Sequence, residues 1–389
     1  MRILDVCAFY SPQGGGVRTY VQRKMKAAAA LGHEVIILAP GACDEIVERH
    51  PNAVLATISS PVLPLDRRYR YFGDEAALHA ALDKWRPDII EASSPWASAA
   101  MVARWKGTAF RALVMHADPL SAYAYRWFKR FATRQTIDWG FSAFWNHLRR
   151  LDREFDLVVT AGEDFARRLR AGGLQKVATV PMGVEPGIFS PQARDEALRA
   201  ALLKTCGLGP DATLLIGLGR LAAEKRWPMV VDAATAAGNR CPLGLILIGT
   251  GPQEDRIQRA IGDNPHIKLF PPVQDRPRLA KLLASADALV HGCEAETFCM
   301  VAAEGRASGL PLIVPDCGGA ADQFSPGRGQ MYRASDGAHL RDQFLRFTMS
   351  APHLHRSRAA ADATRVRAMD EHFEDLFSAY GAQRTRLAA

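Results

Sequence analysis

This chain of 389 residues lacks the long apolar segments that would place it in a membrane. No window approaches the roughly 18 consecutive apolar residues that a membrane-spanning helix needs. An acid, Asp5, interrupts the first apolar run, so this run predicts a strand and not a secretory signal. We therefore expect a cytoplasmic protein that can meet a lipid surface only peripherally, at the inner face of the cytoplasmic membrane.

Signatures of a bound metal are also missing. The seven cysteines are scattered, none of them in a Cys-x-x-Cys pair, and no histidines are clustered at metal-ligand spacing. This pattern suits a reducing compartment and argues against structural zinc. We expect neither a metal nor a cofactor.

The chain also lacks the motifs of two classes of binding protein. Its net charge of +8 favours anionic partners, such as nucleotides, nucleic acid or a lipid surface. No RNA- or DNA-recognition motif is present, so we do not expect nucleic acid as a partner. A nicotinamide-dependent oxidoreductase would show Gly-x-Gly-x-x-Gly after its first strand, and Gly14-Gly15-Gly16 does not continue in that way.

What the chain does contain is a regular alternation of short apolar runs with helical patterns. Such alternation predicts α/β architecture, with parallel sheets covered on both faces. In the first half the expected strands are 3–9, 34–38, 53–58, 89–92, 112–115 and 157–160, with a helix after Gly16. In the second half they are 214–218, 244–248, 267–270, 288–291 and 312–314.

A stretch rich in proline and glycine, 181–191, separates the two halves and predicts a linker. We therefore expect two Rossmann-like, doubly wound domains, 1–184 and 185–365, facing a central cleft where ligands bind. Residues 358–389 show one apolar face at helical spacing and predict a helix. Its last part, 366–389, is expected to pack back on the first domain.

The strongest motif for chemistry runs from Glu296 to Glu304, in front of the expected strand 312–314. A helix beginning near Phe298 would point the free amides of Phe298, Cys299 and Met300 at an anion such as a phosphate. Glu304, about one turn later, leans back toward the helix start and can accept hydrogen bonds from sugar hydroxyls. The alternative is that Glu304 is a charge on a solvated helix face, but its neighbours are small or apolar, as in a buried helix.

A second motif, 217–226, follows the first strand of the second half and contains Arg220 and Lys225. Cations at a strand end beside a cleft can neutralise a diphosphate leaving group. Either residue alone would more often be a surface charge. Their pairing at one strand end favours a phosphate role.

Two weaker features belong to the first half. Gly15 and Gly16 join the first strand to a helix, where glycine lets backbone amides approach a ligand, although many such turns need glycine for geometry alone. His116 ends the expected strand 112–115. A histidine in such a place is more often packed than catalytic.

Taken together, these motifs resemble the GT-B glycosyltransferases of the large retaining Glu-x7-Glu family (family 4-like), which includes bacterial α-mannosyltransferases and glycolipid-forming enzymes. The resemblance rests on Glu296 and Glu304, the block 219–225, the linker 181–191 and the Gly-rich first turn. It extends over nearly the whole chain. The combination is specific, whereas each piece alone is not.

The resemblance implies roles for individual residues. Arg220 and Lys225 would bind the diphosphate, Glu296 the donor sugar and Glu304 the ribose, while the amides of 298–301 (Phe298, Cys299, Met300, Val301) would complete the sugar-phosphate pocket. His116 would approach the transferred sugar from the first domain, and Gly15 and Gly16 would close over donor and acceptor. Catalysis would therefore rest on His116, Arg220, Lys225 and Glu296, with no metal.

The implied reaction is transfer of a hexose, mannose or glucose, from a nucleotide diphosphate sugar to a lipid or saccharide acceptor with retention of configuration. The form Glu296-Thr297-Phe298 is similar to that of the α-mannosyltransferase branch and favours GDP-mannose over a UDP-sugar. The family commonly has glycine where this chain has Cys299, so a side chain reshapes the loop near the sugar.

Between residues 123 and 147 the chain is dense in aromatic and basic residues and predicts two amphipathic helices. Aromatic anchors beside lysine and arginine are typical of helices that lie on anionic lipid, so an anionic membrane surface is a candidate partner. Packing of these aromatics into the first domain explains the pattern equally well.

The functional alternatives for the whole chain are a related epimerase or phosphorylase and a non-enzymatic nucleotide-sugar-binding protein.

Overall fold

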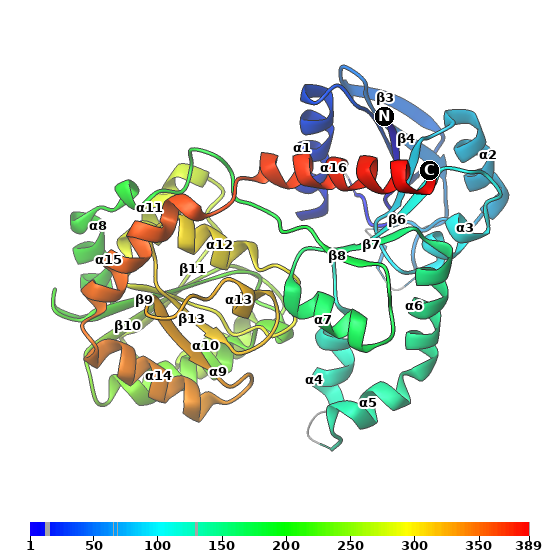
Figure 1. Cartoon of the computed structure of the whole chain (residues 1–389). Coiled ribbons are helices and arrows are strands. Elements are labelled where there is room, and N and C mark those ends of the chain that lie inside the picture. The colour runs from blue at the N-terminus through cyan, green and yellow to red at the C-terminus, as the bar shows by residue number, and fades with distance from the viewer. Residues whose placement is uncertain (12–15, 65, 68, 129–130, 389) are drawn as a thin grey trace.

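The structure is a computed structural model that describes residues 1–388 apart from 12–15, 65, 68 and 129–130. Two α/β lobes lie side by side, and a long helix at the end of the chain crosses from the second lobe to the first (Figure 1). The first lobe contains an eight-stranded sheet and the second a six-stranded sheet. The predicted fold class, two doubly wound parallel-sheet domains, is therefore confirmed.

The first sheet has the order β3-β4-β2-β1-β5-β6-β7-β8. Its strands are β1 (Arg2–Val6), β2 (Glu34–Gly41), β3 (Glu45–His50), β4 (Ala53–Ser59), β5 (Ile89–Ala92), β6 (Phe110–Met115), β7 (Leu157–Thr160) and β8 (Val177–Thr179). The strands pair in parallel except β3, which is antiparallel to β4. The sequence analysis did not predict β3 or β8, because β3 is a polar edge strand and β8 has only three residues.

Helices cover both faces of this sheet, and a separate apolar core fills each side. The helices of the first lobe are α1 (Gly16–Ala30), α2 (Glu75–Trp85), α3 (Ala97–Arg104), α4 (Tyr125–Phe128), α5 (Arg134–Gly140), α6 (Ser142–Glu154) and α7 (Glu163–Ala171), with one π-helical turn at Leu120–Ala124.

The second sheet has the order β11-β10-β9-β12-β13-β14, all parallel. Its strands are β9 (Thr213–Leu218), β10 (Leu243–Ile248), β11 (Ile267–Phe270), β12 (Ala288–Val290), β13 (Leu312–Pro315) and β14 (Gly329–Tyr332). The strand order reverses between β9 and β12, and ligands of open α/β sheets bind outside the carboxyl ends of strands at such a point. In the first sheet the same reversal lies between β1 and β5.

The helices of the second lobe are α8 (Glu196–Thr205), α9 (Trp227–Gly238), α10 (Glu254–Ile261), α11 (Arg276–Ser285), α12 (Met300–Ala307), α13 (Gly319–Asp322), α14 (Gly337–Met349) and α15 (Pro352–Asp362), with 3-10 turns at Pro191–Ala193, Ala223–Lys225 and Ala363–Arg365. Helices α8, α11 and α14 each begin after an aspartate whose carboxylate accepts an amide of the first turn. Such caps satisfy a donor that has no partner within the helix.

The chain passes between the lobes twice, and the two passages touch. Val184 pairs with Ala368 in a short parallel bridge, and Gly183 lies so close that an added Cβ would stand 2.2 Å from the carbonyl oxygen of Ala368. This pairing corrects the expectation of one helix over 358–389, because residues 366–368 are extended to meet the linker. The helix resumes as α16 (Met369–Ala388) and buries Phe373, among others, against the first sheet.

The aromatic segment 123–147 divides into two parts. Trp145 and Leu148 of α6 are buried in the first lobe, so packing explains this half. The other half is a surface of five exposed rings, called here the aromatic surface: Tyr123, Trp127, Phe128, Phe131 and Trp139. Phe131 and Trp139 are 86% and 79% exposed.

Candidate functional site

A cavity of about 630 Å³ lies between the two lobes and is lined by both. The first lobe contributes residues that follow β1, β5 and β6, together with the start of α1. The second contributes the loop before α12 and the first residues of that helix. Of the predicted site residues, those that line the cavity are Gly16, His116, Glu296, Phe298, Cys299, Met300, Val301 and Glu304.

The loops that follow β9 and β12 bring Lys225 and Glu296 together. The ammonium group of Lys225 contacts the carboxylate of Glu296 directly, although 71 residues separate them in the chain. Burial alone would lower the pKa of Lys225 and raise that of Glu296. Glu296 more than offsets this effect at Lys225, and His291 together with Lys225 more than offsets it at Glu296. The pKa of Lys225 is therefore raised and that of Glu296 is lowered, so both are ionised.

Arg220 lies outside the lining of this cavity, with its side chain 69% exposed. Its guanidinium binds Glu224 at 2.7 Å, and Glu224 also lies 3.5 Å from Arg126 of the first lobe. The backbone of Arg220 is anchored, because its carbonyl accepts a hydrogen bond from the Trp227 indole at 3.1 Å. Arg220 is thus placed at the β9 end beside Lys225, with its side chain directed to a carboxylate at the interface of the lobes.

The helix of the Glu-x7-Glu motif begins later than the sequence analysis predicts. It starts at Met300, because Cys299 has a left-handed backbone with φ +66° and cannot continue a helix backwards to Phe298. The amide of Ala302 already bonds to the carbonyl of Cys299. The amides of the first turn that remain available to an anion are therefore those of Met300 and Val301. Phe298 lies before the helix, so its amide does not belong to the first turn.

Glu304 is 5% exposed, so it is not a charge on a solvated helix face. It pairs with Arg276 at 2.6 Å, and Arg276 also lies 3.5 Å from Glu185 and stacks over the Phe189 ring. Burial raises the pKa of Glu304, and Arg276 opposes this shift. The sequence analysis did not single out Arg276. Its position at the start of α11 carried no motif, and only the fold places it in the cavity.

His116 faces the second lobe from the end of β6. Its carbonyl accepts a hydrogen bond from the Thr297 hydroxyl at 2.9 Å, which ties the Glu296 loop to the first lobe. Burial lowers the pKa of His116 to about 4, so the imidazole is neutral at pH 7. The Tyr20 ring packs edge-on against the His116 ring, with 4.9 Å between the ring centroids. The Tyr20 hydroxyl lies 3.0 Å from Nε2 of His372 in α16.

Gly16 is the first residue of α1 and borders the cavity, but a Cβ added there would meet nothing within 4 Å. The structure therefore gives no steric reason for glycine at this position. Gly15 lies outside the described residues. The closure of this loop over donor and acceptor stays a prediction.

A buried charge cluster lies beneath the first-lobe side of the cavity. Lys24 of α1 is fully buried and donates to Asp5 at 2.9 Å and to Glu91 at 2.5 Å, while Ser93 donates to Asp5 at 2.6 Å. Asp5 and Ser93 line the cavity. The sequence analysis missed this cluster because Lys24 and Glu91, 67 residues apart, show no local pattern.

One group of possible metal ligands was found among the described residues. Atoms of His291, Glu296 and Cys299 that could each bind an ion all lie within 4.8 Å of one another. The histidine and the cysteine are buried, and the glutamate is partly exposed.

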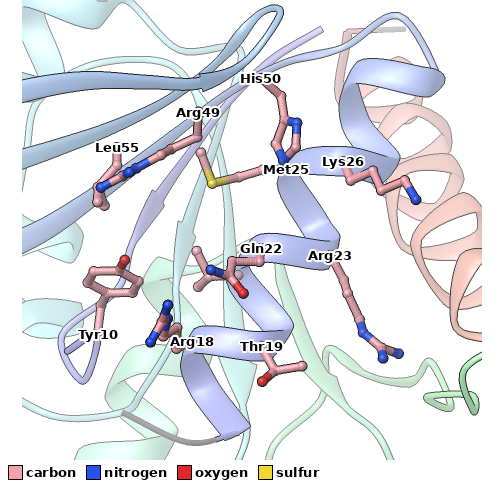
Figure 2. A pocket seen from close by; sticks show the side chains of 11 residues that line it. Tyr10, Arg18, Thr19, Gln22, Arg23, Met25, Lys26, Arg49, His50 and Leu55 are labelled. Carbon is pink, nitrogen blue, oxygen red and sulfur yellow. The ribbon is translucent and has the colours of Figure 1, made fainter. Parts of the chain in front are cut away.

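A second cavity, of about 620 Å³, also lies at α1 and is lined by residues of α1, β3 and β4. Arg18, Arg23, Lys26, Arg49 and His50 line it, and no carboxylate does. Figure 2 shows Arg18 and Arg49 on the strand side of α1, and Arg23 and Lys26 on its other side. We call it the basic cavity.

Comparison with known proteins identifies two glycosyltransferase regions. The family described as "Glycosyltransferase Family 4" matches residues 14–187, and "Glycosyl transferases group 1" matches residues 212–348. Together these matches cover most of each lobe.

Relatives resemble the chain over most of its length. A GDP-mannose-dependent alpha-(1-6)-phosphatidylinositol dimannoside mannosyltransferase of Mycobacterium tuberculosis is 29% identical over 369 residues, 92% of this chain and 91% of the relative. A GDP-mannose-dependent alpha-mannosyltransferase of Corynebacterium glutamicum is 26% identical over 84% of this chain and 75% of the relative. Among solved structures, the sucrose-phosphate synthase of Thermosynechococcus elongatus shares the fold over 100% of both chains, with a TM-score of 0.75 at 17% identity.

Proposed function

Because this chain belongs to the GT-B glycosyltransferases, built from a family 4 region and a group 1 region, we propose that it transfers mannose from GDP-mannose to a hydroxyl group of a lipid or glycan acceptor. The choice of donor is supported by the names of both relatives, which use GDP-mannose. The proposal includes retention of configuration at the transferred sugar.

The observation that carries this proposal is the convergence of Lys225 and Glu296 at the point where the strand order of the second sheet reverses. The ammonium group of Lys225 and the backbone amides of Met300 and Val301 attract anions. A nucleotide diphosphate would therefore place its phosphates near these groups. Glu296 would then accept hydrogen bonds from the sugar. His116 faces the same space from the first lobe.

Donor binding would require three existing ion pairs to rearrange. Arg220 would leave Glu224 to reach the diphosphate, and Lys225 would share its charge between Glu296 and a phosphate. Glu304 would exchange part of its contact with Arg276 for ribose hydroxyls. At Arg220 and Lys225 an anionic phosphate would replace or share an anionic carboxylate partner, so both cations would keep a counter-charge.

The proposal of retention is supported by the ion pairs of the carboxylates in the cavity. The carboxylates that line its described part each have a cationic partner: Asp5 has Lys24, Glu185 has Arg23, Glu296 has Lys225 and Glu304 has Arg276. None is therefore placed as a free nucleophile or general base. In the proposed route the leaving phosphate would take the acceptor proton.

For the acceptor side we propose that the molecule works at an anionic lipid surface. No helix in the described part of the chain has both the length and the apolar character that crossing a membrane requires. The aromatic surface offers exposed rings of the kind that insert at a lipid interface. The basic cavity beside α1 offers cations to a phosphate.

A thermal-shift series with GDP, UDP, ADP and their sugars tests the donor. A ligand that binds only the folded state stabilises it by RT ln(1 + [L]/Kd), so GDP and GDP-mannose should raise the melting temperature more than the other nucleotides. A larger shift with UDP-sugars would overturn the choice of GDP-mannose. Retention is tested by the anomeric configuration of the product, determined by NMR.

Liposome sedimentation tests the surface. The chain should sediment with vesicles that contain an anionic phospholipid and stay in solution with zwitterionic vesicles, and Phe131→Ser with Trp139→Ser should weaken the binding. Binding that is independent of lipid charge and of both substitutions would contradict the proposed anionic lipid surface.

Release of GDP only when acceptor is present separates transfer from the epimerase and phosphorylase alternatives.

A further inference from the structure

Three side chains in the second lobe form a set of metal-ligating type that the transferase reaction does not use as a unit. His291 follows β12 directly, Glu296 lies in the loop after it, and Cys299 caps α12. An imidazole nitrogen, a carboxylate oxygen and a thiol sulfur lie within 4.8 Å of one another. These are the three atom types that zinc binds in proteins.

The imidazole of His291 lacks a proper hydrogen-bond partner. The side chain is completely buried, Nδ1 has no hydrogen-bond partner, and the contact of Nε2 is a long one. Nε2 is aimed at Oε1 of Glu296, but the 3.4 Å between them exceeds the usual length of such a bond. A buried polar group without a partner is costly, and such groups in native proteins often mark the place of an ion or water.

The backbone is fixed at two of the three ligands, His291 and Cys299. The carbonyl of His291 accepts a hydrogen bond from the Tyr332 hydroxyl at 2.8 Å, which anchors the end of β12. Cys299 is 2% exposed and has a left-handed backbone at the first turn of α12, so its thiol has little freedom to turn away. Both Glu296 and Cys299 line the cavity between the lobes, which gives an ion a path of entry.

We propose that His291, Glu296 and Cys299 bind a thiophilic divalent cation such as Zn²⁺, and that the bound ion blocks the donor pocket. The ligand atoms would move together by roughly 1 Å to reach the tetrahedral spacing of a zinc site. The thiol would release its proton to solvent, and the thiolate and the carboxylate would balance the charge of the ion. A thiolate ligand favours Zn²⁺ over Mg²⁺ or Ca²⁺.

The ion and the donor exclude each other because they use the same carboxylate. Lys225 contacts Oε1 of Glu296, the same oxygen that lies nearest to His291. An ion at this oxygen would expel the ammonium group of Lys225 and occupy the place of a sugar hydroxyl. This exclusion rests on the proposed donor site, whereas binding of the ion does not.

Titration of the whole purified chain with Co²⁺, a spectroscopic substitute for Zn²⁺, tests the site directly. In buffer with a phosphine reductant and no chelator, one equivalent should produce a sulfur-to-cobalt charge-transfer band, and Zn²⁺ should abolish it. Cys299→Gly, which suits the left-handed backbone and should fold, should lose the band and weaken binding at least ~10-fold. Mg²⁺ should not compete.

Two other thiols serve as controls. Cys293→Ser removes a buried thiol from the same loop, and Cys43→Ser removes an exposed thiol of the first lobe. Both variants should keep the band. No band in the unaltered chain, a band that survives in Cys299→Gly, or a band that depends on Cys293 would overturn the metal site.

Lys225→Gln gives a test of opposite sign. It removes the cation that competes for Glu296, so it should tighten Co²⁺ binding by ~10-fold or more while it impairs transfer. Weaker binding in this variant would overturn the assignment of Glu296 as a ligand.

Thermal shift then separates the two halves of the proposal. With Zn²⁺ bound, the stabilisation by GDP-mannose should fall, and a chelator should restore it. If the cobalt band appears and depends on Cys299 but the GDP-mannose shift is unchanged, the exclusion and the placement of the donor at Glu296 are overturned. If donor binding is normal and no band forms, only the metal site fails.

Discussion

The strand order reverses beside the first strand in both lobes, between β1 and β5 and between β9 and β12, but the charges near that point differ between the lobes. In the second lobe, Lys225 and Glu296 are paired at that point and remain partly exposed, at 15% and 24%. In the first lobe, Lys24 and its partner Glu91 are completely buried.

The difference shows that topology supplies a place for a ligand but does not decide whether one binds. The pair in the second lobe can exchange partners with an incoming diphosphate or sugar, since solvent reaches it. The cluster in the first lobe has no such freedom, because α1 and α16 cover it. It supports the wall of the cavity, which Asp5 and the neutral His116 line.

The largest effect is expected from the buried cluster. Lys24→Met leaves Asp5 and Glu91 buried without their cation, which should lower the free energy of unfolding by about 3–5 kcal/mol. Chemical denaturation measures this change. Lys26→Met is the control, because Lys26 lies two residues later on the same helix and is exposed. It should change the free energy of unfolding by less than about 0.5 kcal/mol. Equal effects would show that the first-lobe cluster is not a structural support.

The second-lobe pair should affect catalysis more than stability. Lys225→Ala should lower kcat by about 10²-fold or more, as loss of a donor to transition-state charge does. Arg341→Ala, which removes a side chain that pairs with the neighbouring Asp342, should leave kcat unchanged. A Lys225→Ala enzyme with near-normal turnover would remove the contrast between the lobes.

The pH dependence of stability should show whether His372 of α16 is buried in its neutral form. Burial lowers the pKa of His372 to about 4, so the native state keeps it neutral while the unfolded state binds a proton below about pH 6.5. Stability from this residue is therefore present at pH 7 and lost as the pH falls toward 4. Between pH 7 and 4.5 the unaltered chain should lose about 2 kcal/mol more than His372→Gln. Parallel curves for the two proteins would contradict a buried neutral histidine.

The smallest effect concerns the backbone of the donor loop. At Cys299, with φ +66°, glycine avoids the strain that any Cβ causes, so Cys299→Gly should be more stable than Cys299→Ala by about 1 kcal/mol. The order would be reversed at an ordinary helical position such as Ala303. Urea denaturation of the two variants measures the difference, and a more stable alanine variant would show that the loop adopts another conformation.

Much of the fold could be predicted from short apolar runs, because buried parallel strands need continuous apolar sequence. The run 244–248 appears as β10, which is buried along its whole length. The polar strand β3 and the three-residue strand β8 could not be predicted in this way, since their pairing depends on neighbours and not on their own composition. The break before α16 was missed for the same reason, because Ala368 is held by Val184 from the distant linker.

The candidate site divides along a similar line. Spacing within a motif indicated Glu296, Glu304 and Lys225, because each lies in a loop after a strand or on the helix that follows such a loop. Arg276 and Lys24 carry no such signal and became visible only through their partners.

The sequence by itself determined the fold class and the kind of chemistry, since strand-helix alternation and short motifs are local properties of the chain. Tertiary structure alone decided which charges stay open to a ligand and which are neutralised. The Tyr20 hydroxyl meets His372 across 352 residues, and Lys24 meets Glu91 across 67. The physical reason is that burial, and with it the state of an ionisable group, depends on everything packed around that group.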